Sequence, residues 1–178
     1  MGTNVKIKIL LIEDDINECN AFAKHIKTRE DVELIGTTNS SSEGINYLKN
    51  YKVDAVILDI ELQHGKGSGI EFIEELNNMK LNYIPMIVVI SNNLGSRVYN
   101  FLHSHRIEYI FYKGEEDYSQ EKVINTIISL TPYCNNTKPT IVKMGSETID
   151  LKDEYETIVS NKINKVLDDL RSCKKIIR

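Results

Sequence analysis

The stretch KIKILLIED, residues 6–14, places a short apolar run directly before two carboxylates, Glu13 and Asp14. The same design recurs in VDAVILD, residues 53–59, which ends on Asp59. Short apolar runs bounded by polar residues are typical of strands that are buried in a sheet. The charged residues therefore stand just past the ends of two predicted strands.

A third run, IEYIFYK at residues 107–113, ends on Lys113. The carboxyl ends of parallel strands lie along one edge of the sheet, where open α/β sheets bind their ligands. We therefore expect one crevice to hold four charged side chains: Glu13, Asp14, Asp59 and Lys113. Clustered carboxylates repel one another unless a cation lies between them, so the group indicates a hard divalent metal. A lysine beside such a site can hold a transferred anion.

The segments between these runs continue an alternation of strands and helices. Strands are expected near residues 5–12, 32–35, 53–58, 85–90 and 107–112. Helices are expected at 16–27, from the capping box Ser40-Ser41-Ser42-Glu43 to about Leu48, and near 70–79, 94–102 and 123–128. Strand–helix units in series predict a parallel sheet with helices on both faces.

Composition and charge restrict the functions open to the chain. Its 178 residues are 41% hydrophobic and carry a formal charge of −4, enough apolar material for one ordinary domain and an additional element. Residues 1–137 carry −6 and residues 138–178 carry +2, so the acidic part suits a cation site and the whole chain lacks the charge of a nucleic-acid binder. The three cysteines have no metal-ligand or redox spacing. Without a visible signal peptide or membrane-length apolar run, we expect a cytoplasmic protein that does not contact a membrane.

The chain divides into three parts. Residues 1–131 form the predicted domain, residues 132–145 a linker and residues 146–178 a helical extension. Within the extension, apolar residues recur at helical spacing over 155–170. Because about 40 residues rarely form an independent core, this helix is expected to pack on the first domain, to pair with another chain, or to begin a larger domain.

The order of these motifs resembles the receiver domain of two-component response regulators. That family has an acidic pair after the first strand, Asp after the third, Ser or Thr after the fourth and Lys after the fifth. The corresponding residues here are Glu13-Asp14, Asp59, Ser91 and Lys113. The resemblance covers residues 5–131. It implies a flavodoxin-like, doubly wound five-stranded parallel sheet of order 2-1-3-4-5, followed here by the C-terminal helical extension.

The resemblance also implies a function. Asp59 would accept a phosphoryl group from the phosphohistidine of a sensor histidine kinase or a phosphotransfer protein. A Mg²⁺ ion would have four protein contacts: Asp14, Asp59, Glu13 through a water, and the backbone carbonyl of Glu61. Lys113 and the Ser91 hydroxyl would bind phosphoryl oxygens. The chain would switch a signalling or transcriptional output, with only Mg²⁺-dependent self-phosphorylation and autodephosphorylation as its own chemistry.

Partner surfaces follow from the same resemblance. It allows a homodimer through the fourth helix, fifth strand and fifth helix, or through the C-terminal helix. Residues 155–170 are similar to the first helix of the output domain of sporulation-type regulators. A helix-turn-helix needs further helices, so we do not expect these 178 residues alone to bind DNA. We prefer a helix that packs on this domain or on a partner.

Several positions depart from the family pattern. The loop after Asp59 is longer than usual and lacks the common proline. Gly114 stands where the family has a cis proline, Ile110 stands where it has the switch aromatic, and Asn92 replaces a typically small residue. These departures keep a second hypothesis open, that of an atypical, unphosphorylated receiver-like module for protein interactions.

Some residues have simpler explanations than a role in chemistry. Asp15 is the expected N-cap of the first helix, with Glu18 at N3. The Gly-rich segment 65–69 lacks the spacing of a phosphate-binding loop. A phosphatase with an aspartyl-phosphate intermediate would use Glu61 as its acid/base group, but no further motif of that class follows. The acidic loop after the first strand disfavours flavin. The histidines fit no ligand set and are expected at or near the surface: His25, His64, His103 and His105.

Overall fold

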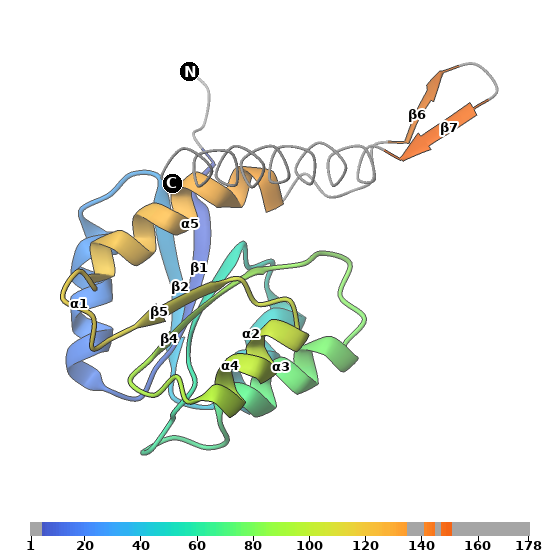
Figure 1. Ribbon diagram of the computed structural model, residues 1–178. Helices are drawn as coiled ribbons and strands as arrows, with labels where there is room; N and C mark the ends of the chain where they lie inside the picture. The colour runs from blue at the N-terminus through green and yellow to red at the C-terminus, as the bar shows by residue number, and fades with distance from the viewer. Residues whose placement is uncertain (1–4, 135–140, 145–146, 151–178) are drawn as a thin grey trace, which may run out of the picture. The chain divides into compact units, whose positions relative to one another are not determined.

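The computed structural model describes residues 5–134, 141–144 and 147–150. The chain forms two compact units that divide after Asn135, and each is described by itself. The first unit contains a parallel sheet of five strands in the order β2-β1-β3-β4-β5 (Figure 1). Its strands are β1 (Ile7–Ile12), β2 (Val32–Thr38), β3 (Ala55–Asp59), β4 (Met86–Ser91) and β5 (Tyr109–Tyr112). The predicted strand order 2-1-3-4-5 is confirmed.

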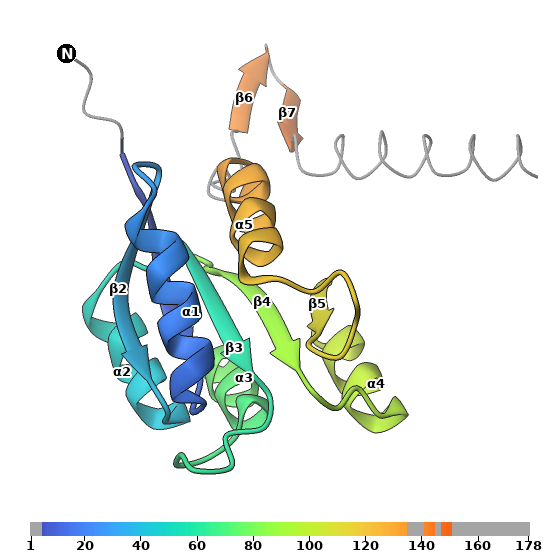
Figure 2. The same ribbon diagram turned by 90° about the vertical axis from the view of Figure 1, so that its left-hand side faces the viewer.

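Helices connect the strands and cover the sheet on both sides. They are α1 (Ile16–Lys27), α2 (Ser41–Asn50), α3 (Gly69–Asn78), α4 (Ser96–Ser104) and α5 (Gln120–Cys134). α1 and α5 cover one face, and α2, α3 and α4 cover the other (Figures 1 and 2). A helical crossover between successive strands is what allows the strands to run parallel. α5 extends three residues beyond the predicted end of the domain at residue 131.

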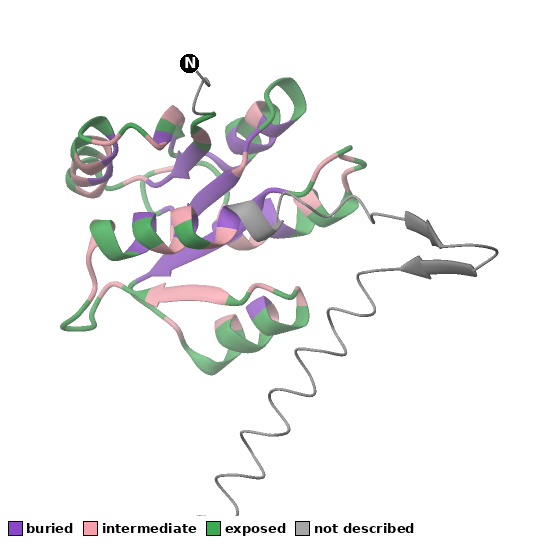
Figure 3. Cartoon of the chain, turned by 90° about the horizontal axis from the view of Figure 1, so that it is seen from above, coloured by how far each residue is buried: buried purple, intermediate pink, exposed green. Residues whose placement is uncertain are grey.

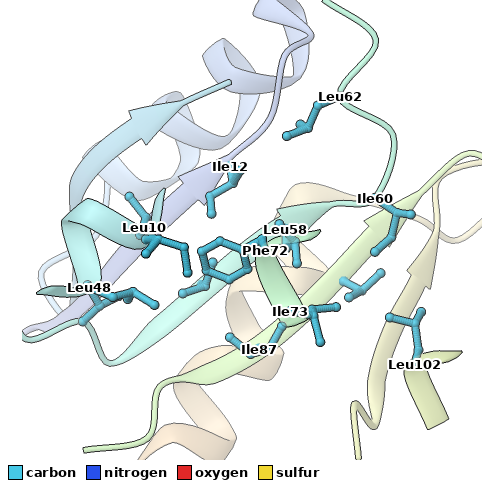
Figure 4. Close-up of a cluster of buried hydrophobic side chains, with 14 residues drawn as sticks. Leu10, Ile12, Leu48, Leu58, Ile60, Leu62, Phe72, Ile73, Ile87 and Leu102 are labelled. Carbon is cyan, nitrogen blue, oxygen red and sulfur yellow. The ribbon is translucent and has the colours of Figure 1, made fainter. Parts of the chain in front are cut away.

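The side chains of each central strand alternate between two hydrophobic clusters. On the α2–α4 side, Leu10 and Leu58 pack with Phe72 of α3 (Figure 4). On the α1–α5 side, the neighbouring residues Ile9 and Ile57 pack in a cluster that contains Phe22 of α1 and Val123, Ile124 and Ile127 of α5. Every residue of β3 and β4 is buried, whereas the edge strand β5 is half-buried up to its last residue, Tyr112, which is exposed (Figure 3). Burial on both faces explains the continuous apolar runs of the central strands.

The loop between β3 and α3 depends on two glycines. Gly67 has a φ of 81°, which side-chain-bearing residues rarely adopt. A Cβ on Gly69 would lie 2.4 Å from the backbone oxygen of Asp59, so the missing side chain lets α3 begin directly against the end of β3. The Gly-rich segment therefore serves close backbone packing.

The predicted capping box at the start of α2 forms only in half. The Ser40 hydroxyl accepts the backbone N–H of Glu43 at 3.5 Å, as predicted. The Glu43 carboxylate, however, accepts the hydroxyl of Thr38 at 2.6 Å. The Ser40 N–H donates to that same Thr38 hydroxyl at 3.1 Å. A full capping box would have Glu43 accept the Ser40 N–H directly. Here the Thr38 hydroxyl lies between them, because β2 continues three residues beyond its predicted end at Ile35.

The described part of the second unit is an antiparallel hairpin of β6 (Ile141–Met144) and β7 (Glu147–Asp150). The sequence pattern does not predict this hairpin, whose first strand lies in the predicted linker. The predicted helix at 155–170 lies outside the described residues. Among the helices that the structure describes, none has both the length and the apolar character needed to cross a membrane.

Candidate functional site

The carboxyl edge of the sheet carries a pocket of about 760 Å³. The structure brings the four charged residues of the sequence motif together there, from the segments that follow or end three strands. Glu13 and Asp14 follow β1, Asp59 ends β3 and Lys113 follows β5, and all four line the pocket. Glu13 and Lys113, 100 positions apart, meet because the parallel sheet aligns its strand ends.

Lys113 is the cation at the centre of this group. Its Nζ donates to Glu13 Oε2 and to Asp59 Oδ2, each at 2.7 Å. The side chains are almost fully buried, with 9% of Lys113, 6% of Asp59 and none of Glu13 exposed. β4 separates β3 from β5 in the sheet, so the lysine side chain spans the end of β4. The Lys113 backbone N–H donates to the backbone oxygen of Ser91 at 2.9 Å, which fixes the Lys113 backbone beside the end of β4.

Burial and hydrogen bonding act in opposite directions on this pair of charges. Burial raises the pKa of Glu13 to about 7, although the hydrogen bond from Lys113 works against that shift. Glu13 Oε1 also accepts the backbone N–H groups of Asp14 at 3.1 Å and Asp15 at 3.0 Å. For Lys113, burial alone would lower the pKa, but the hydrogen bonds to Asp59 and Glu13 outweigh it and raise the pKa. Lys113 is therefore cationic at neutral pH.

The loop after β3 closes on Asp14. The backbone N–H of His64 donates to Asp14 Oδ2 at 2.5 Å, and the His64 ring nitrogen Nδ1 lies 3.3 Å from the same oxygen. The His64 side chain is 85% exposed, so its predicted surface location is confirmed. Its contact with Asp14 was not predicted. The loop after Asp59 is longer than usual, but its length alone does not specify this contact.

Asp59 lines the pocket and is almost fully buried. Its Oδ1 accepts the backbone N–H of Glu61 at 3.0 Å, while Lys113 holds its Oδ2. The Glu61 carboxylate accepts the side-chain amide of Asn93 at 3.2 Å, which links the loops after β3 and β4. The backbone carbonyl of Glu61, the predicted metal contact, accepts the N–H of Gln63 at 3.1 Å. A carbonyl oxygen has a second lone pair, so this bond is compatible with a ligand role.

Ser91 lies at the end of β4 and is fully buried. Its hydroxyl donates to the backbone oxygen of Asn93 and accepts the N–H of Asn93, both at 3.0 Å. Such a local turn satisfies the hydroxyl within its own loop. Asn92, the next residue, is the one from this loop that lines the pocket.

The oxygen atoms present fit a hard cation. Glu13, Asp14 and Asp59 each offer a carboxylate oxygen, and these oxygens all lie within 4.8 Å of one another. Mg²⁺ prefers oxygen ligands and commonly takes only one or two carboxylates with several waters. Asp15 is the helix cap that the sequence predicts, because its Oδ1 accepts the N–H of Asn17 at 2.8 Å. Three carboxylates therefore remain for a metal.

One wall of the pocket was not predicted. The Tyr118 hydroxyl donates to Glu18, and the Gln120 amide donates to the two Glu18 oxygens at 3.1 and 3.2 Å. A glutamate at N3 is expected to bond back to the helix cap. Glu18 instead faces the loop after β5. No spacing in the sequence relates Glu18 to Tyr118 and Gln120, and only the fold brings them together.

Comparison with known proteins agrees with this geometry. The family model of the response regulator receiver domain matches residues 9–117. The response regulatory domain of mrkE from Klebsiella pneumoniae has the same fold, with a TM-score of 0.57 at 21% identity, covering 71% of this chain and 96% of that one. The response regulator domain of Thermotoga maritima CheB gives a TM-score of 0.58 at 16% identity, covering 76% of this chain and 100% of that one.

A curated relative is a protein-glutamate methylesterase/protein-glutamine glutaminase of Clostridium acetobutylicum. It is 30% identical over 83 residues, which are 47% of this chain and 23% of the relative. A second methylesterase/glutaminase, from Geobacter sulfurreducens, is 26% identical over 107 residues, or 27% of its length. The chain thus matches about a quarter of each relative. With the family model spanning more than half of the chain and the sheet order in agreement, this chain belongs to the response regulator receiver domain family.

Proposed function

We propose that this chain is a response regulator receiver in which Asp59 accepts a phosphoryl group from a phosphohistidine. The donor would be a sensor histidine kinase or a phosphotransfer protein. The placement of Asp59 supports this proposal most directly. Asp59 ends β3, and its carboxylate lines the pocket, 2.7 Å from a lysine ammonium and beside two further carboxylates.

The chemistry of the proposed step matches the groups present. A carboxylate oxygen of Asp59 attacks phosphorus in line, a new P–O bond forms and the P–N bond to the donor imidazole breaks. The imidazole leaves with the electron pair. Catalysis of phosphoryl transfer is mostly positioning and charge neutralisation. Lys113, whose flexible stem carries a point charge, would move from Asp59 Oδ2 to a phosphoryl oxygen. The Ser91 hydroxyl would exchange its bonds with Asn93 for another phosphoryl oxygen.

A bound Mg²⁺ would neutralise negative charge on the incoming phosphoryl group. The residues that would hold it are Asp14, Asp59, Glu13 through a water, and the carbonyl of Glu61. The contact of His64 with Asp14 would position that carboxylate. The remaining assignments belong to this proposal as well: a cytoplasmic phosphorelay, a transcriptional output, and homodimers through α4-β5-α5 or the C-terminal segment.

Phosphodonor chemistry tests the proposal. Phosphoramidate or acetyl phosphate with Mg²⁺ should add one phosphoryl mass to the intact chain, and EDTA should prevent the addition. Asp59→Asn should abolish it. Asp54→Asn is the matched control, because Asp54 lies just before β3, at the far end of the strand, and accepts the N–H of Lys8 at 2.9 Å. An adduct on Asp59→Asn, or none on the wild type, would count against the proposal.

A second candidate function is an unphosphorylated module for protein interactions. Two observations favour it: the Ser91 hydroxyl is satisfied within its own loop, and Ile110 of β5, at the switch position, packs half-buried against the α2–α4 cluster. This candidate predicts no phosphoryl adduct and no stabilisation by Mg²⁺. The same mass measurement therefore separates the two functions.

A further inference from the structure

The segments after β1 and after β5 meet at two separate points. At the first, Lys113 donates to Glu13, and at the second, Tyr118 donates to Glu18. Both pairs are 100 residues apart in sequence, so the two segments run in the same direction with a constant offset. Gln120 strengthens the second point with its bonds to Glu18 at 3.1 and 3.2 Å.

The stretch between the two points is exposed. Residues 114–117 are all exposed to solvent. They are shaped by two turn bonds, from Glu115 N–H to the Tyr112 oxygen and from Tyr118 N–H to the Glu115 oxygen, each at 3.1 Å. Exposed turns of this kind contribute little rigidity. The end of the loop next to α5 is therefore fixed by the hydrogen bonds of Tyr118 and Gln120 to Glu18.

Glu18 offers a rigid anchor for that loop. It lies in the first turn of α1, whose start is fixed by the Asp15 cap. The Tyr118 ring packs against the α1–α5 hydrophobic cluster, which aims its hydroxyl at Glu18. Burial, and then the hydrogen bond to Glu18, raise the pKa of Tyr118, so the hydroxyl is protonated and remains a donor across the physiological range. Hydrogen bonds to charged groups are stronger than those between neutral groups.

We propose that Tyr118 is a positioning residue, which through Glu18 holds the β5–α5 loop so that Lys113 points between Glu13 and Asp59. The inference rests on the proposed function, since Lys113 would there bind the phosphoryl group. Tyr118 does not touch the reacting oxygen. It sets the fraction of time that Lys113 points between Glu13 and Asp59. The phosphorylation rate depends on that fraction, because small displacements of a catalytic group strongly reduce rates.

The test compares two tyrosines. Tyr118→Phe removes the hydroxyl and keeps the ring, and it should slow phosphorylation of Asp59 by phosphoramidate about tenfold while leaving the Mg²⁺ dissociation constant unchanged. Tyr83→Phe is the matched control. The Tyr83 hydroxyl is also partly buried and donates to the backbone oxygens of Leu48 at 2.9 Å and Tyr51 at 2.7 Å, outside the pocket lining. Its loss should leave the phosphorylation rate at the wild-type value.

A double-mutant cycle separates positioning from general stability. If Tyr118 acts through Lys113, Tyr118→Phe should have almost no effect in a Lys113→Ala background, because the two changes share one pathway. A merely structural role would give the same tenfold loss in both backgrounds. A wild-type rate for Tyr118→Phe, or full additivity, would overturn the inference.

An NMR measurement tests the inference whether or not the chain is phosphorylated. Two buried carboxylates protect the Lys113 ammonium from solvent exchange, so its ¹⁵Nζ signal should be visible in the wild type and in Tyr83→Phe. In Tyr118→Phe it should shift or be lost to fast exchange. An unchanged signal would refute the positioning role, whereas a wild type that forms no adduct would refute the proposed function alone.

Discussion

Lys113 and Asp59 contact each other across a strand that lies between theirs. Nζ of Lys113, just after β5, is 2.7 Å from Oδ2 of Asp59, at the end of β3, and β4 separates the two strands. Only a long side chain can span that separation. The same ammonium also binds Glu13, so one cation bridges two buried carboxylates.

Replacing Lys113 should destabilise the fold. Lys113→Met keeps the apolar stem but leaves Glu13 and Asp59 buried without a cation, and breaking such a group costs about 3 kcal/mol. Urea unfolding at pH 7.5 in EDTA measures the loss. Lys49→Met is the control, because Lys49 and Glu75 form an exposed pair at 3.7 Å. That change should stay within about 0.5 kcal/mol. Equal stability of Lys113→Met and the wild type would show that the pair is not stabilising.

Mg²⁺ should stabilise the folded chain. A ligand that binds the native state alone adds about 2.7 kcal/mol when its concentration is a hundredfold above its Kd. Thermal unfolding with and without Mg²⁺ should show a higher midpoint with the ion, and Asp14→Asn should abolish the shift. Asp117→Asn should retain it, since Asp117 is exposed and pairs with Lys122 at 2.5 Å. A shift of equal size in Asp14→Asn would place the ion elsewhere.

Cys19 should react slowly with thiol reagents. Burial, and then the nearby carboxylates beginning with Glu13, raise its pKa from 9.0 to about 11. The thiolate fraction at pH 8 is then about a hundredfold below that of an ordinary thiol, and the rate should keep rising with pH up to about 11. A variant with Cys134→Ser and Cys173→Ser isolates the signal. Fast labelling at pH 8 in the folded state would contradict the partial burial of Cys19 and its raised pKa.

Asp15 should matter for stability and not for phosphorylation. It caps α1 through the N–H of Asn17 at 2.8 Å, and losing such a cap costs about 1 kcal/mol. Asp15→Ala should lower the free energy of unfolding by that amount, and Asp15→Ser should restore most of it. Both variants should form the phosphoryl adduct to the wild-type extent. If Asp15→Ala instead lost Mg²⁺ binding, Asp15 would be a metal ligand.

The resemblance to receiver domains implies the sheet order, and the apolar runs themselves predict that Glu13, Asp14, Asp59 and Lys113 meet at the strand ends. The local sequence also predicts the Asp15 cap. Contacts between distant loops are not local. The Tyr118 bond to Glu18 and the His64 bond to Asp14 depend on loop paths that no residue spacing encodes. For Ser91, the sequence predicts its position at the end of the fourth strand. It does not predict that the Ser91 hydroxyl bonds to the backbone of Asn93.

Identification of the modified residue tests the central claim most directly. Borohydride reduces an acyl phosphate to an alcohol, so treatment after phosphoramidate and Mg²⁺ should convert Asp59, and no other aspartate, into homoserine. Peptide sequencing by mass spectrometry locates that residue. The account predicts homoserine at position 59 alone. Homoserine at another position, or an adduct that resists borohydride, would contradict it.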